Sequence, residues 1–218
     1  MNRENWPIVP DAMLFAIITF VIALFLYIAW GVIAAVIPAL FLLFTLYFFR
    51  NPQRNHEADA LSVISPADGV ILNIEEVEET RFLKTPSLKI SIFLSVFNVH
   101  VNRTPIEGTV EFIHYQPGKF FPAYKGHASH LNERNYMGLR STNYPGIAVL
   151  VVQITGFVAR RIVCWVKEGD KLDRGQRFGL IKFGSCTEIY LPKGSVSAVK
   201  KGDKVKGGQT IIGRLPHE

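Results

Sequence analysis

The residues of this chain best suited to unusual chemistry are Gly184 and Ser185, which lie among strand-forming residues. Glycine leaves its carbonyl uncrowded and permits strained backbone, and a serine hydroxyl becomes a nucleophile when a base activates it. Two interpretations are open. The pair forms a turn between strands, as most Gly-Ser pairs do, or the chain cuts itself here and turns the serine into a catalytic carbonyl.

His100 is the first choice for acid–base work, because a histidine both accepts and donates a proton near neutral pH. Its plain structural interpretation is a polar residue on a strand next to a turn. Asp68, in Pro-Ala-Asp-Gly, has the plain interpretation of a turn aspartate. Cys164 and Cys186 have neither metal-ligand spacing nor the pattern of a disulfide framework, so we expect no metal site.

The elements that must position these residues begin with an apolar run. Residues 12–49 contain no Asp, Glu, Lys or Arg, and a helix needs roughly 20 apolar residues to cross a bilayer. We expect two transmembrane helices that turn at Gly31, with a single tilted span as the second interpretation and a soluble core helix as the third. Arg3 before the run, and Arg50 and Arg54 after it, predict that both ends are cytoplasmic.

Residues 50–218 carry a net charge of +7, since the whole chain is +6 and its first 49 residues contribute −1. A basic domain attached to a membrane is attracted to anionic lipid headgroups. Nucleic acid is the competing partner for a basic surface, but the sequence contains no nucleic-acid motif. We therefore expect a membrane partner and no nucleic acid.

Short runs rich in Val, Ile and Phe alternate with Gly, Pro, Asn and Asp after residue 50, which predicts a mainly antiparallel β domain. The only helix candidate in this part is a short one around Asn132–Met137. With the N-terminal helices, the predicted fold class is mainly β (α+β), with residues 1–49 as membrane anchor and residues 50–218 as catalytic domain. The expected strands are 69–74, 88–94, 108–113, 147–154 and 158–165.

A weak internal repeat accompanies this pattern. Residues 168–179 and 201–212 both contain Gly-Asp-Lys, an apolar residue, two further residues and Gly-Gln. This resembles the hairpins of small barrel-sandwich domains of the biotinyl and lipoyl type, in which Gly-Asp supplies a turn. A carrier function would need an exposed lysine at a hairpin tip between apolar residues, and the sequence offers none.

Six segments, taken together and in order, resemble the phosphatidylserine decarboxylase family, in particular its short form. They extend from about Phe48 to the end of the chain. The segments are Phe48-Phe49-Arg50-Asn51-Pro52, Ser65-Pro66-Ala67-Asp68-Gly69, Phe97-Asn98-Val99-His100-Val101-Asn102-Arg103-Thr104-Pro105, Gly118-Lys119-Phe120, Asn132-Glu133-Arg134-Asn135 and Phe183-Gly184-Ser185.

The resemblance implies a self-cleaving proenzyme with a covalent pyruvoyl group. Decarboxylation leaves a carbanion that needs an electron sink. Ser185 would attack the Gly184 carbonyl, and the chain would separate into residues 1–184 and a shorter chain that begins with pyruvoyl at position 185. That ketone would form a Schiff base with phosphatidylserine, or a related serine phospholipid such as archaetidylserine, and release CO₂ and the ethanolamine lipid. The expected product is a heterodimer at the cell membrane, with its catalytic domain on the cytoplasmic side.

The resemblance also assigns roles to individual residues. His100 would be the acid–base residue, and Asp68 would assist it during self-cleavage, since an aspartate bonded to a histidine fixes the imidazole tautomer. Longer bacterial members have a second histidine where this chain has Arg103, which cannot act as a base. We expect Arg103 to bind the substrate carboxylate or phosphate, with Asn98 and Lys119 as further substrate contacts. Three aromatic residues either pack in the core or reach the headgroup layer: Phe120, Phe121 and Tyr124.

The alternative from another class is a non-catalytic, membrane-anchored β-sandwich adaptor. Secretion-system adaptors also combine an N-terminal span with Gly-Asp hairpins. They have long helical heptads between those hairpins, which this chain lacks.

Overall fold

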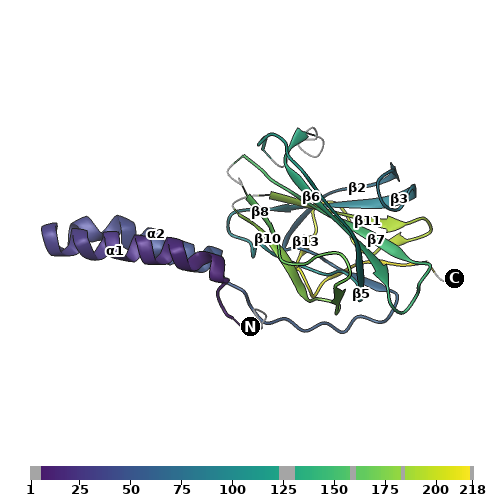
Figure 1. Ribbon diagram of the computed structural model, residues 1–218, viewed down its shortest axis with the longest axis horizontal. Coiled ribbons are helices and arrows are strands. Elements are labelled where there is room, and N and C mark those ends of the chain that lie inside the picture. The colour runs from purple at the N-terminus through teal and green to yellow at the C-terminus, as the bar shows by residue number, and fades with distance from the viewer. Residues whose placement is uncertain (1–5, 123–130, 158–160, 183–184, 217–218) are drawn as a thin grey trace. The chain divides into compact units, whose positions relative to one another are not determined.

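The computed structural model describes residues 6–122, 131–157, 161–182 and 185–216. The chain divides into two compact units, Met1–Gln53 and Arg54–Glu218. Figure 1 shows the first as a pair of helices and the second as a set of strands. The predicted fold class, mainly antiparallel β with apolar helical structure at the N-terminus, is confirmed.

The first unit is a helical hairpin. A 3₁₀ turn (Pro10–Ala12) leads into α1 (Met13–Trp30), and α2 (Val32–Phe48) follows after Gly31, whose φ of 80° permits the tight reversal. Pro10–Trp30 is long and apolar enough to cross a membrane, whereas Val32–Phe48 is a shorter apolar helix. The helical structure supports membrane association, while the number of spans stays a prediction.

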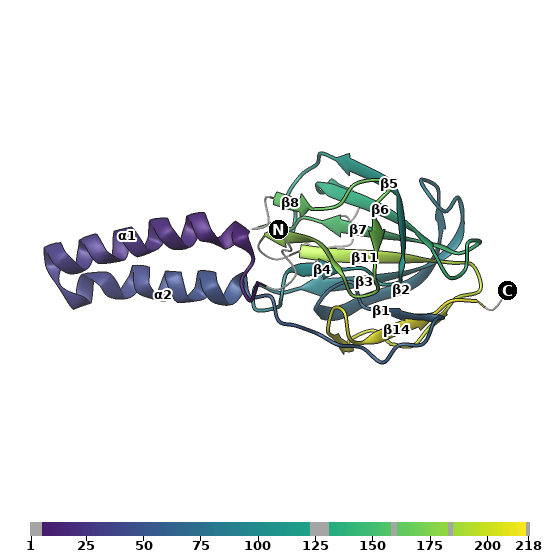
Figure 2. The ribbon, with the colours of Figure 1, turned by 60° about the horizontal axis from the view of Figure 1, so that its bottom comes forward.

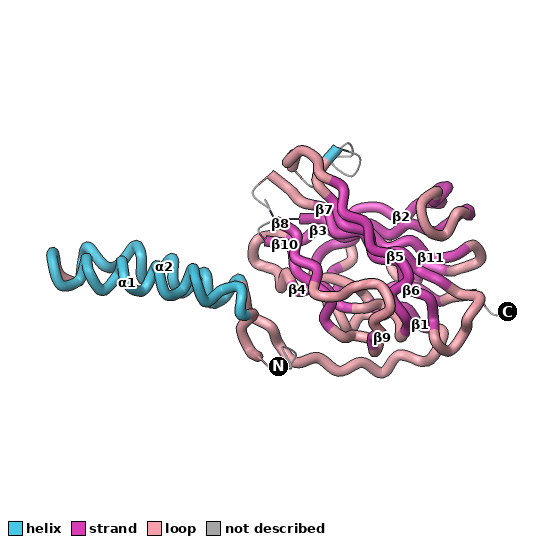
Figure 3. The backbone as a smooth tube through the Cα atoms, in the orientation of Figure 1, coloured by secondary structure: helices cyan, strands magenta, loops and turns pink. Residues whose placement is uncertain are grey.

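The second unit is built on an eight-stranded antiparallel sheet, in which β11 lies between β3 and β7 (Figure 2). Strands dominate this unit, as the tube view shows (Figure 3). In sheet order the strands are β13 (Lys204–Val205), β2 (Gly69–Glu79), β3 (Thr85–Leu94), β11 (Ser185–Pro192), β7 (Ala148–Ile154), β6 (Arg134–Ser141), β5 (Gly108–Gln116) and β9 (Lys171–Leu172).

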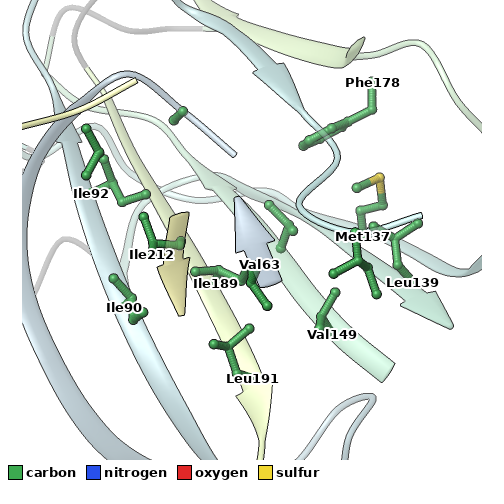
Figure 4. Packing of buried hydrophobic residues seen from close by; sticks show 14 of the residues in the cluster. Val63, Ile90, Ile92, Met137, Leu139, Val149, Phe178, Ile189, Leu191 and Ile212 are labelled. Atoms are coloured by element: carbon green, nitrogen blue, oxygen red, sulfur yellow. The ribbon is translucent and has the colours of Figure 1, made fainter. Parts of the chain in front are cut away.

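Alternate residues of these strands form the main core. Ile90 and Ile92 of β3, and Ile189 and Leu191 of β11, face the same cluster as Phe178 from a neighbouring small sheet (Figure 4). Full burial of each such side chain contributes about 1.5–3 kcal/mol of hydrophobic stabilisation. Because successive side chains of a strand point to opposite faces, residues two apart, such as Ile90 and Ile92, enter the same core.

The prediction of a helix around Asn132–Met137 is wrong. Residues 134–137 of this segment belong to strand β6, which pairs with both β5 and β7. The segment lacks the apolar alternation of a strand because its polar residues are buried and hydrogen-bonded. Asn132 and Asn135 are buried, and their amides bond to Phe121, Thr155 and Gln153. Pairing on both edges decides the conformation, whatever the local propensity.

Two small three-stranded sheets complete the unit, and they have the same construction. The first comprises β1 (Ser62–Ile64), β14 (Ile211–Arg214) and β12 (Val196–Ser197), and the second comprises β4 (Val101–Arg103), β10 (Arg177–Lys182) and β8 (Arg161–Cys164). In each sheet the long strand is central, and its pairing with β1 or β4 is interrupted by a bulge at the corresponding position.

These sheets belong to two copies of one motif that contact each other reciprocally. The Ile64 backbone N–H donates to the Pro105 carbonyl at 3.1 Å, and the Arg103 N–H donates to the Pro66 carbonyl at 2.9 Å. Residues 61–71 thus correspond to residues 100–110. In the predicted Gly-Asp hairpins, Gly169 and Gly202 both have φ of 92°, and Gly175 and Gly208 have φ of 78° and 77°. The repeat seen in the sequence is the second part of a larger duplicated motif.

Replacement of Gly208 by alanine should destabilise the protein more than the same change at Gly202. Both have positive φ, which costs an alanine about 1–2 kcal/mol. Only at Gly208 does the added Cβ meet a side chain, at 2.5 Å from Cδ of Arg103, whereas nothing lies within 4 Å at Gly202. Overpacking adds about 1–3 kcal/mol. Thermal unfolding of detergent-solubilised Gly208→Ala and Gly202→Ala should differ by several degrees; equal midpoints would contradict this packing.

Candidate functional site

Ser185 is the first residue of β11, at one end of the eight-stranded sheet. It pairs with Leu94 of β3, and the next residue, Cys186, pairs with Ile154 of β7. Ser185 is 0% exposed, and its hydroxyl has no hydrogen-bond partner among the described residues. A buried hydroxyl without a partner costs about 1–3 kcal/mol, so its retention calls for a functional explanation. Gly184 lies outside the described residues.

His100 directly precedes β4 and is buried beside the strand that leads to Ser185. Its carbonyl accepts a hydrogen bond from Ile181 N–H at 3.3 Å, near the end of β10 at Lys182. The His100 Nδ1 atom lies 3.0 Å from the Asn98 carbonyl oxygen. Because a carbonyl oxygen only accepts, this contact assigns the proton to Nδ1 and leaves Nε2 of the neutral ring as the acceptor. His100 makes no hydrogen bond to the Ser185 hydroxyl in this structure.

Asp68 is held by a two-pronged ion pair with Arg54, in which Arg54 Nη2 donates to Oδ2 at 2.8 Å and Nη1 donates to Oδ1. The Gly207 N–H also donates to Oδ1 at 2.8 Å. The partners of Asp68 among the described residues are thus Arg54 and Gly207, and not His100. The Asp68 loop meets the strand of His100 instead through its backbone, where the Pro66 carbonyl accepts the Arg103 N–H. The assisting role of Asp68 stays a prediction.

The three residues expected to contact substrate lie in different settings, and Arg103 pairs with Arg177 at the end of β10 that is farther along the chain from Ser185. Arg103 is buried, donates from Nη1 to the Gly175 carbonyl at 3.0 Å and packs against Gly208. The Asn98 side-chain oxygen accepts hydrogen bonds from the backbone N–H and hydroxyl of Ser95, at 2.9 and 2.8 Å, and so closes the turn before His100. Lys119 is exposed on the loop after β5.

A buried polar network that the sequence did not reveal links the strand of His100 to the strand of Ser185. Asn102 donates from its side-chain nitrogen to the Thr187 hydroxyl at 3.2 Å and accepts from the Gln153 side chain at 2.9 Å. Asn135 in turn donates to Gln153 at 3.1 Å. Asn102 lies two residues after His100, and Thr187 lies two residues after Ser185, so each points to the same side of the chain as its candidate catalytic residue. The network therefore fixes the register of the two strands that carry the candidate catalytic pair.

The duplicated motif offers an internal control for these residues. Because residues 61–71 correspond to residues 100–110, His100, Asn102 and Arg103 occupy the positions that Leu61, Val63 and Ile64 occupy in the other copy. The two copies have the same backbone pairing, and the first copy forms it with apolar side chains at these positions. The fold thus does not require polar side chains at these positions, which favours a functional explanation for the second copy. Alignment of the two Ser/Thr-Pro segments would have revealed this in the sequence.

Cys186, next to Ser185, is not a competing nucleophile. Burial raises the pKa of its thiol far above the usual range, and the neighbouring Glu188 carboxylate adds to the effect. The thiolate, not the thiol, is the reactive form. Its side chain also points to the opposite face of the sheet, where it packs with Leu150 and Ile154. Among the described residues no three His, Cys, Asp or Glu side chains gather as a metal site would require.

Comparison with known proteins adds to this geometry. The sequence profile of the family described as phosphatidylserine decarboxylase matches residues 41–213. A phosphatidylserine decarboxylase proenzyme from Carboxydothermus hydrogenoformans is 59% identical over 177 residues, which are 81% of this chain and 82% of that protein. Proenzymes of the same name from Symbiobacterium thermophilum and Geotalea uraniireducens are 48% and 45% identical, over 98% and 99% of this chain and 95% and 100% of their own lengths.

Replacing Asn102 by valine, the residue of the other copy, should leave a folded protein but slow the predicted cleavage of the 184–185 bond at least tenfold. The change removes the hydrogen bonds to Thr187 and Gln153, at a cost of about 1–3 kcal/mol for the groups left unpaired. Gel electrophoresis of freshly made protein measures the cleaved fraction.

Val63→Ala is the matched control, because it weakens the equivalent strand of the other copy by removing buried methyl groups. It should lower the unfolding temperature and leave the cleavage rate within about twofold of the unaltered chain. Asn102→Asp, which retains an acceptor for Gln153 and for the Thr187 hydroxyl, should recover part of the rate. If Val63→Ala slows cleavage as much as Asn102→Val, the network acts on stability alone.

Proposed function

The chain belongs to the phosphatidylserine decarboxylase family, and we propose that it is a self-processing enzyme that releases CO₂ from phosphatidylserine, or a related serine phospholipid, to form the ethanolamine lipid. Family membership confirms the predicted class, a decarboxylase, and argues against the non-catalytic adaptor. The observation that carries the mechanism is the buried hydroxyl of Ser185, which has no partner among the described residues. Ser185 begins a central strand that the Asn102–Thr187 hydrogen bond links to the strand after His100.

In the proposed maturation, the Ser185 oxygen attacks the Gly184 carbonyl carbon, and the peptide bond between them becomes an ester. Removal of the Ser185 α-proton expels the Gly184 carboxylate and leaves a dehydroalanine. Addition of one water and loss of ammonia convert this residue to pyruvoyl. The Ser185 hydroxyl fits the start of this sequence, because no described hydrogen bond holds it elsewhere. A pyruvoyl group supplies an electrophilic carbonyl that captures the substrate amine and accepts the electron pair left by CO₂.

His100 is the proposed general base and acid. With its Nδ1 proton held by the Asn98 carbonyl, Nε2 is the atom that takes the proton from Ser185 and later returns one to the product carbon. Asp68 is proposed to assist during cleavage, and its ion pair with Arg54 keeps the carboxylate fixed in a loop that contacts the strand of His100.

Lys119 is the proposed contact for the lipid phosphate, because its ammonium is exposed and the residue lies on a loop at the Ser185 end of the sheet. Arg103 and Asn98 are proposed to act near the serine carboxylate. Their described contacts, with the Gly175 carbonyl and with Ser95, keep the two segments that flank His100 in place.

We further propose that the mature protein is a heterodimer of residues 1–184 and 185–218 at the cell membrane. The pairing of β11 with β3 and with β7 supports this, since those hydrogen bonds do not depend on the 184–185 bond. The apolar hairpin supports the membrane location, and Arg50 and Arg54 favour a cytoplasmic catalytic domain.

Ser185→Ala should abolish cleavage, because alanine has no nucleophile with which to form the ester. Intact-mass analysis should find one chain of 218 residues. The unaltered protein should give two chains, the smaller one beginning at residue 185 with a blocked amino terminus that reacts with hydroxylamine.

Ser195→Ala is the control for this experiment. Ser195 follows β11, and its hydroxyl bonds to the Pro192 carbonyl, so its loss should leave cleavage and decarboxylation unchanged. A Ser185→Ala protein that remains cleaved, or that still decarboxylates phosphatidylserine, would refute the mechanism.

A further inference from the structure

The end of the sheet that carries Ser185 is also the end at which several loops leave it. Ser185 pairs with Leu94, the last residue of β3, and Arg134, the first residue of β6, pairs with the last residues of β7 and β5, Ile154 and Gln116. The described parts of these loops are residues 95–99, 117–122, 131–133 and 155–157. We call this set the rim.

The rim exposes large hydrophobic side chains. Phe97 is 65% exposed, Phe157 68%, Leu131 45% and Phe120 36%. In the described part of the second unit, three other large hydrophobic residues are exposed, and of these Tyr115 lies on β5 next to the rim. Only Val196 and Ile211 belong to other strands. An exposed apolar group confined to one end of a domain indicates a binding surface.

The charge around the rim favours a lipid partner. Lys119 on the rim is exposed, as is Arg161 at the start of β8, and Lys182 at the end of β10 is half-buried. The described rim residues include one acid, Glu133, and it is buried. In the described rim, apolar side chains lie next to cations and no acid is exposed, which matches the chemistry of an anionic bilayer surface, where each nearby Lys or Arg contributes about 1 kcal/mol.

We propose that Phe97, Phe120, Leu131 and Phe157 enter the headgroup and upper acyl layer of an anionic membrane and hold the Ser185 end of the sheet against it. The proposal rests on the proposed function and specifies the surface by which the catalytic domain meets its substrate. Of the three aromatic residues for which the sequence left core packing and the headgroup layer as alternatives, Phe120 is exposed, Phe121 is half-buried, and Tyr124 lies outside the described residues. The structure adds Phe97 and Phe157, which are more exposed than Phe120.

The direct test places a photoreactive benzoylphenylalanine at position 157 or, as control, at position 211 of the full chain. The protein is reconstituted in vesicles of phosphatidylglycerol and phosphatidylethanolamine. Irradiation should attach lipid at position 157 and little at position 211, detected by mass spectrometry. Attachment to a second protein molecule at 157, or equal lipid attachment at both positions, would overturn the proposal. This readout does not require decarboxylation, so it is independent of the proposed function.

A kinetic test compares two double variants, Phe97→Ser with Phe157→Ser, and Val196→Ser with Ile211→Ser. The rim variant should lose at least tenfold in kcat/KM on phosphatidylserine in vesicles, but less than twofold on dispersed dihexanoyl phosphatidylserine, and should self-cleave normally. The control variant should change less than twofold on both substrates. Equal losses by the rim variant on both substrates would overturn the proposal, whereas an unaltered protein that acts on neither substrate would overturn the proposed function instead.

Discussion

The pairing of β11 on both of its edges is the constraint on which the rest of the structure depends. The strand begins at Ser185, and it is bonded to β3 and β7 from its first residues. A break in the chain just before such a strand leaves its ladder hydrogen bonds and its buried side chains in place. A break within the strand would interrupt both. The candidate scissile bond, at the boundary of a central strand, is thus placed where a covalent cut leaves the pairing of the core strands in place.

The duplicated motif explains how polar chemistry is accommodated in this core. One copy has the apolar residues Leu61, Val63 and Ile64, while the other places His100, Asn102 and Arg103 at the equivalent positions. Burial of amides is costly unless they are hydrogen-bonded. The Asn102 amide meets this condition through Thr187 and Gln153. The same backbone thus supports a purely apolar and a polar version, and the polar version adjoins the strand of Ser185.

Much of the fold and part of the site could be predicted from local pattern. Short runs rich in Val, Ile and Phe, bounded by Gly, Pro, Asn and Asp, predicted β2, β3, β5 and β7, and the uncharged run predicted the helical hairpin. Strand β6 was missed because Asn132 and Asn135 are satisfied by partners on other segments, which no local pattern shows. Asn102 was missed for the same reason, and so was Arg54, whose role as the partner of Asp68 depends on tertiary placement. The exposure of Phe97 and Phe157 likewise depends on the tertiary position of their loops, because the sequence around an isolated aromatic residue does not tell whether its side chain is buried or exposed.

The enclosure of Ser185 bears on the timing of the proposed maturation. A residue that is 0% exposed meets no bulk solvent while the sheet is closed, yet the proposed conversion to a ketone would consume a water molecule and release ammonia. Both must pass through transient openings of the strand ends, which have their own free energy, smaller than that of global unfolding. The rate at which a newly made molecule matures would then depend on how often the strand ends open, as well as on the intrinsic reactivity of the serine.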